Sequence, residues 1–137
     1  MIYVLDSSFV AAQIIPDEFD LQVKKMYSKI NNDDEKCTPQ LFWYEMTNLF
    51  KNLLRRKRYS IEEVMEFHRP LAAIRLVSES GSGVEYSQKL LRLCNEYDIS
   101  SYDASYLELA KRKNAVLCTL DTNLIAAAKK HGTAVLN

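Results

Sequence analysis

The 137-residue sequence contains only three glycines, three prolines and three cysteines. So little glycine and proline argues against a loop-rich scaffold. The cysteines, at positions 37, 94 and 118, are odd in number, lie far apart and form no C-x-x-C pair. With only two histidines beside them, they make neither a disulfide framework nor a zinc site. We expect three reduced cysteines that pack as small apolar residues.

The sequence also lacks a long apolar run, a cleavable leader and an excess of either charge. No run approaches the ~18 residues of a membrane span. The first apolar run, Ile2 to Leu5, is short and ends directly at Asp6. We therefore expect a cytoplasmic protein without membrane contact. Because 18 basic residues balance 18 acidic ones, nothing attracts the whole chain to nucleic acid.

Apolar residues make up 47% of the sequence and charged residues 26%, which is typical of a globular protein. The length predicts one domain, residues 1–137. Short apolar runs alternate with helical periods, which predicts a three-layer α/β/α sandwich around a mostly parallel sheet. Strands are expected at 2–5, 36–38, 115–120 and 133–136. The segment 74–77 is expected to be either a strand or a frayed helix end. Helices are expected at 7–15, 19–30, 39–58, 60–73, 84–97, 101–113 and 122–130.

Four carboxylates occupy positions that are candidates for a functional site in this fold. Asp6 and Asp121 directly follow predicted strands, and the carboxyl ends of parallel strands form the usual site of an open α/β sheet. Asp103 lies in the first turn of a predicted helix, and Glu45 lies inside another. Each also has a structural explanation: the two strand-end aspartates as helix N-caps, Asp103 as a complement to a helix dipole, and Glu45 on a solvated face.

Taken together, the carboxylates indicate a metal site. Glu45 shares the edge of a core stripe with Asn48 and Asn52, which suggests a polar cleft. Carboxylates in one cleft raise each other's pKa unless a cation neutralises them. Oxygen ligands without thiolate or imidazole suit Mg²⁺ or Mn²⁺, which support phosphodiester hydrolysis. The sequence has no G-x-S-x-G, Walker A or G-x-G-x-x-G motif. It also has Ser8 where haloacid-dehalogenase phosphatases carry a second aspartate.

Four segments of the chain resemble a known family. In their order and spacing they are similar to the PIN domain, and more narrowly to the ribonuclease toxins of VapBC toxin–antitoxin modules. The segments are Tyr3 to Ser8, Pro39 to Glu45 with Asn48, Tyr102 to Ala110, and Thr119 to Leu124.

This resemblance implies a parallel sheet flanked by helices, with Asp6, Glu45, Asp103 and Asp121 as the catalytic and metal-binding residues. Supporting positions match Ser7, Asn48, Thr119 and Asn123. Many family members carry a further acid where this chain has Asn123. We therefore expect one tightly held Mg²⁺ or Mn²⁺, with a second recruited by the RNA phosphate.

The resemblance also implies the partners. These are an RNA substrate, a cognate VapB-type antitoxin, and a second copy in a homodimer or a larger hetero-oligomer. The antitoxin groove has five candidates: Phe19, Leu21, Tyr27, Phe42 and Trp43. The basic cluster Arg55, Arg56, Lys57 and Arg58 is a candidate RNA-binding element. Two other functions remain open at this point: a PIN-like binding module with little activity of its own, and a metal-dependent small-molecule phosphatase.

Overall fold

A computed structural model describes residues 1–137. Its centre is a four-stranded sheet in the order β3-β2-β1-β4, with every neighbouring pair parallel. This confirms the predicted α/β architecture. The strands are β1 (Ile2–Leu5), β2 (Glu35–Pro39), β3 (Val77–Glu79) and β4 (Val116–Cys118).

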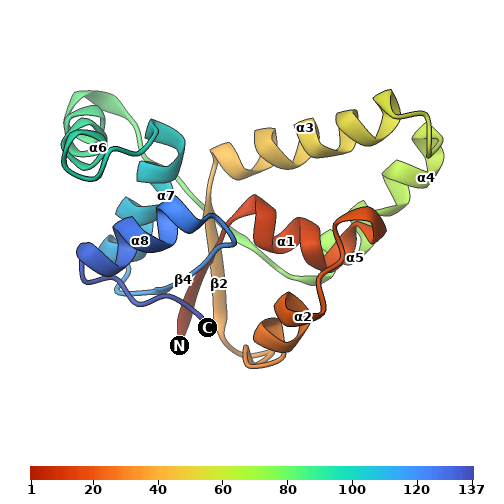
Figure 1. Cartoon of the computed structure of the whole chain (residues 1–137), viewed down its shortest axis with the longest axis horizontal. Helices are drawn as coiled ribbons and strands as arrows, with labels where there is room; N and C mark the ends of the chain where they lie inside the picture. Colours follow the sequence, from red (N-terminus) through yellow and green to blue (C-terminus); the bar gives the residue numbers. More distant parts are fainter.

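The helices cover both faces of this sheet. Figure 1 shows α1 to α5 on one side and α6 to α8 on the other. None of them is both long and apolar enough to cross a membrane. The helices are α1 (Ser7–Ile14), the 3-10 turn η1 (Pro16–Glu18), α2 (Leu21–Tyr27), α3 (Leu41–Arg55), α4 (Ile61–Glu66), α5 (His68–Ala73), α6 (Gly83–Tyr97), α7 (Ser101–Arg112) and α8 (Thr122–Lys130).

β1 is the central element of the fold. It pairs with β2 through Val4 and Cys37, and with β4 through Val4 and Leu117. Tyr3, Val4 and Leu5 are all buried, as expected for a strand covered on both faces. The residue after β1 therefore lies in the middle of the carboxyl edge of the sheet.

The helix expected at 60–73 is divided at Phe67 into α4 and α5. Pro70 explains the break, because a proline in a continuous helix would clash with the carbonyl of Glu66 and leave it without a donor. In the observed arrangement, Pro70 is the third residue of α5. A missing N–H costs nothing in a first turn, since those donors have no helical partner.

Three other boundaries differ from the expectation. Pro39 ends β2 instead of opening α3, and it lies opposite Glu79 of β3. The third strand begins at Val77, where the expected segment 74–77 ends. The final segment, expected as a strand over 133–136, forms one isolated parallel bridge between Val135 and Leu117.

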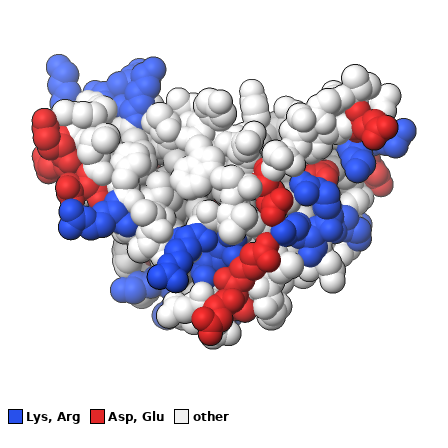
Figure 2. Space-filling model, turned by 180° about the vertical axis from the view of Figure 1, so that it is seen from behind, with Lys and Arg blue, Asp and Glu red and all other residues white.

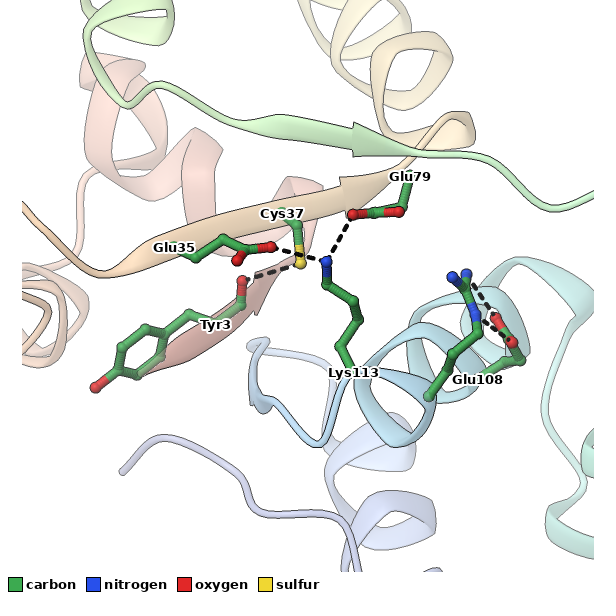
Figure 3. Close-up of polar contacts among 7 residues, drawn as sticks. Tyr3, Glu35, Cys37, Glu79, Glu108 and Lys113 are labelled. Atoms are coloured by element: carbon green, nitrogen blue, oxygen red, sulfur yellow. Dashed lines mark hydrogen bonds and ion pairs between the residues drawn. The ribbon is translucent and has the colours of Figure 1, made fainter.

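Lys113, the residue that caps the C-terminus of α7, joins two strands of the sheet. Its amine lies 2.8 Å from a carboxylate oxygen of Glu35 on β2 and 2.8 Å from one of Glu79 on β3. Figure 3 shows the amine between the two carboxylates, beside Cys37. The hydrogen bonds to Glu35 and Glu79 raise the pKa of Lys113. The contact ties α7 to the edge of the sheet that carries β3.

Replacing Lys113 with methionine should lower the free energy of unfolding by about 1 kcal/mol, because two partly covered carboxylates lose their shared cation. Chemical denaturation measures this change. Arg69→Met is the matched control, since Arg69 pairs with Glu66 only on the open surface and should change stability by less than about 0.5 kcal/mol. Equal effects of the two substitutions would mean that Lys113 contributes no more than a surface ion pair.

Candidate active site at the carboxyl ends of the strands

Asp6 is the most buried of the four carboxylates, with 6% of its surface exposed. It caps the N-terminus of α1, where one carboxylate oxygen accepts from the Phe9 N–H at 3.0 Å and from the Ser8 hydroxyl at 2.6 Å. The other oxygen accepts from the Thr119 hydroxyl. Burial raises the pKa of Asp6, although these hydrogen bonds oppose the change. The carboxylate is therefore fixed in one orientation.

Thr119 couples the ends of β1 and β4. Its hydroxyl donates to Asp6 and accepts from the backbone N–H of Asp121 at 3.1 Å. The Ser8 hydroxyl accepts from the Leu120 N–H at 3.3 Å. These contacts place the two strand-end aspartates next to each other across the edge of the sheet. Thr119, expected to be a supporting residue, contacts Asp6 directly.

Glu45 reaches this edge from α3, and a tyrosine of α7 holds it. The buried Tyr106 hydroxyl donates to a carboxylate oxygen of Glu45 at 2.5 Å. Burial raises the pKa of Glu45, and the nearby Asp6 and Asp103 raise it further, while hydrogen bonds to Tyr106 and Ser7 act in the opposite direction. Ser7, another expected supporting residue, therefore lies within reach of Glu45.

Asp103 and Asp121 occupy the more open side of the site. Asp121 caps α8 by accepting from the N–H groups of Asn123 at 2.8 Å and Leu124 at 3.0 Å. Asp103 lies in the first turn of α7. Burial raises the pKa of Asp103, and Asp121 and Asp6 raise it further. The cap roles considered for Asp6 and Asp121 are thus real, and both residues also face the other carboxylates.

No cation of the chain compensates these four carboxylates. The six ion pairs of the molecule all involve other acidic groups. No three Asp, Glu, His or Cys side chains form a ready-made cluster around one point. The donor set nevertheless suits Mg²⁺ or Mn²⁺, because such ions prefer oxygen ligands and commonly bind through one or two carboxylates while keeping several waters.

A polar hollow of about 300 Å³ opens beside Glu45. Asn48 and Asn52 line it from α3, and Ser7 and Ser8 line it from the start of α1. The amides that the sequence placed along the edge of the core stripe therefore border a cleft, as expected. Asn123 is exposed in the first turn of α8.

Sequence reasoning missed two contributors to this site. Tyr106 lies within one of the segments that resemble the family, but no function was predicted for it. Ser8 was noted only because it stands where some phosphatases have an aspartate. One signal was available for Tyr106, which follows Asp103 by three residues and so lies near it on the same side of a helix. The contact with Glu45 joins residues 61 positions apart, and no local pattern reveals it.

The basic cluster expected to bind RNA lies at the end of α3. All four members are exposed, and Figure 2 shows Lys and Arg side chains gathered at that end of the molecule. The guanidinium of Arg58 forms an ion pair with the carboxylate of Asp17 at 3.0 Å. Arg55 and Arg56 form no ion pair. At 1.5 Å per residue, Arg55 lies roughly 15 Å along the helix from Glu45.

Phe42 was expected among the surface residues that receive an antitoxin, and this expectation is wrong. Its side chain is fully buried in the core, because it belongs to the inward stripe of α3 with Met46 and Leu53. Phe19 and Leu21 are more than half exposed. These two therefore remain available for a partner.

The chain is thus an α/β protein whose parallel sheet carries, at its carboxyl edge, four carboxylates that form no ion pair with a basic side chain. The PIN domain matches residues 3–130 of this chain. Ribonuclease VapC3 from Pyrobaculum aerophilum is 31% identical over 128 residues, which cover 88% of this chain and 90% of that protein. The chain belongs to the PIN-domain family and, within it, to the VapC-like ribonucleases. The family resemblance in the sequence is thereby confirmed.

Solved structures agree with the fold. PAE2754 from Pyrobaculum aerophilum has a TM-score of 0.71 at 20% identity, covering 97% of this chain and 87% of its own. VapC20 from Mycobacterium tuberculosis, described as a toxin that cleaves the sarcin–ricin loop, has a TM-score of 0.63 at 20% identity. The match covers 93% of this chain and 95% of VapC20.

Proposed function

We propose that this chain is the toxin of a type II toxin–antitoxin module and cleaves RNA as a metal-dependent endoribonuclease. One observation carries the proposal: Asp6, Glu45, Asp103 and Asp121 lie at the carboxyl edge of the sheet, and no lysine or arginine forms an ion pair with any of them. The relatives support the activity, since one is a ribonuclease and one is an RNA-cleaving toxin.

The four carboxylates would hold the ion together with water molecules. A bound Mg²⁺ or Mn²⁺ supplies Lewis-acid chemistry, which polarises a phosphoryl oxygen and lowers the pKa of an attacking water. The chain's own contribution is positioning. Asp6 is fixed by three donors, and Glu45 is fixed by Tyr106. Asp103 and Asp121 lie on the open side, where substrate must approach.

A cleavage assay on total RNA tests this function. The purified chain should cut RNA when Mg²⁺ or Mn²⁺ is present and should stop when EDTA is added. RNA that stays intact with both metals, while the protein still binds RNA, would contradict nuclease activity and favour a binding module.

An antitoxin and a second copy of the chain complete the proposal. Four large apolar side chains are each more than half exposed. They are Phe19 directly after η1, Leu21 at the start of α2, and Ile61 and Met65 on α4. These side chains remain largely in water in the isolated chain, and a partner that covered them would gain from their removal from water. Co-expression of the chain with a small protein encoded beside it, followed by co-purification, tests the antitoxin.

Replacing Arg55 and Arg56 with serine should weaken RNA binding across sequences and flatten its salt dependence. Each lost phosphate contact reduces the slope of log K against log salt by about 1. Filter binding at several salt concentrations measures the slope. Arg58→Ser is the matched control, because its guanidinium already pairs with Asp17, and it should leave the slope nearly unchanged. A parent-like slope in the double variant would remove these arginines from the RNA interface.

A further inference from the structure

Two exposed tyrosines stand directly before two of the carboxylates. Tyr44 precedes Glu45 on α3 with 76% of its surface exposed, and Tyr102 precedes Asp103 on α7 with 64% exposed. Neither ring is paired with another aromatic ring. Neither hydroxyl takes part in a hydrogen bond of the chain. Packing within the chain therefore gives no reason for two large aromatic side chains at these positions.

The two rings share one hollow of about 460 Å³, which Leu41, Glu45 and Asn48 complete. The starts of α3 and α7 face each other across the carboxyl edge of the sheet (Figure 1). The hollow shares Glu45 with the carboxylate site, so its occupant lies immediately beside the reacting position. Its walls are two aromatic side chains, one leucine, one amide and one carboxylate.

We propose that this hollow holds an unpaired nucleobase of the RNA, stacked on Tyr44 and Tyr102, next to the phosphate to be cut. The inference rests on the proposed function and adds to it a position that binds one base beside the carboxylates. Every base offers a π-face to an exposed aromatic ring. The Asn48 amide offers both a donor and an acceptor to the edge of a base. A base carries no charge, so it fits beside Glu45 while its phosphate lies toward the carboxylates.

A base inside a duplex cannot enter such a hollow, because its faces are already covered by its neighbours. Stacking on side chains is therefore a mode of recognition for loops, bulges and single strands. A peptide from a protein partner is the other possible occupant. RNA is favoured because a nucleotide flanking the scissile phosphate has to lie next to the carboxylates, and this hollow borders them.

Binding of a short, fluorescently labelled single-stranded oligoribonucleotide, measured by anisotropy in EDTA, tests the inference. Tyr44→Ala and Tyr102→Ala should each weaken binding by about 5- to 150-fold, the usual loss for one stacked base. Tyr44→Phe and Tyr102→Phe keep the rings and should bind like the parent. Leu91→Ala is the control, because Leu91 is equally exposed but lies on α6. Melting curves check that each variant is folded.

Two further RNAs identify what the tyrosines contact. A duplex of the same sequence, and a strand that lacks one base but keeps its sugar and phosphate, should bind the parent more weakly and lose less on alanine substitution. Parent-like affinity in both alanine variants would overturn the inference and leave the hollow to a protein partner. Equal losses in the phenylalanine and alanine variants would also overturn it. Because EDTA prevents metal-dependent cleavage, tyrosine-dependent binding by a chain that never cleaves RNA would reject only the nuclease activity.

Discussion

The Asp103→Asn variant should lose metal-dependent RNA cleavage while remaining folded. An amide keeps the shape of the side chain but removes the charge that an ion needs. Asp103 is the most informative of the four positions, because Asp6 and Asp121 also cap helices and their loss would weaken the fold as well. Even removal of a residue that only supports a metal ligand typically costs roughly 10- to 100-fold, so a larger loss is expected here.

Asp98→Asn is the matched control for this substitution. Asp98 is exposed and caps the C-terminus of α6 with a left-handed backbone, φ 52°, which asparagine adopts as readily as aspartate. Its loss removes the same charge five residues away and should leave cleavage unchanged. Parallel assays of both variants with Mg²⁺ and with Mn²⁺ decide the matter. Full activity in the Asp103 variant would exclude this carboxylate from catalysis.

Mn²⁺ or Mg²⁺ should raise the melting temperature of the parent chain strongly. An ion that binds only the folded state stabilises it by about 2.7 kcal/mol at a hundredfold excess over Kd. For a chain of this length, this corresponds to roughly 10 °C. Calorimetry or fluorescence melting with and without metal measures the shift.

Asp103→Asn should change the melting temperature both without metal and with metal. The raised pKa of Asp103 means that the folded metal-free chain holds a proton more tightly than the unfolded chain. The free energy of unfolding therefore falls as pH rises through the interval between the unfolded and folded pKa values, and that loss persists at pH 7. The metal-free variant should melt above the metal-free parent, yet gain less from Mn²⁺. Equal gains in the two proteins would place Asp103 away from the ion.

The sequence predicted the acidic edge because its evidence was local. A buried parallel strand reads as a continuous apolar run, so the residue following β1 could be placed at the carboxyl edge from the sequence alone. The helical period of α3 placed Glu45 beside Asn48 at the border of the core, and both line the observed hollow. The order of the strands, β3-β2-β1-β4, was not predicted, because the alternation of strands and helices indicates a parallel sheet but not the order of its strands.

Contacts between distant segments could not be predicted in the same way. β3 is an edge strand of three residues with no buried member, so it shows no apolar run, and its pairing with β2 depends on backbone groups. The bond from Tyr106 to Glu45 and the hollow between Tyr44 and Tyr102 both require the relative placement of α3 and α7. That placement follows from the way the two helices cover opposite faces of the sheet.

The position of β1 at the centre of the sheet affects how the protein folds during its synthesis on the ribosome. Asp6 is synthesised early, but its neighbour across the sheet edge, Asp121, follows roughly 115 residues later, which is about 6–23 s of translation at typical elongation rates. β1 also lacks one of its two partner strands until residues 116–118 have emerged. A nascent chain therefore carries only part of the acidic edge during most of its synthesis, and the complete site forms only after β4 has joined the sheet.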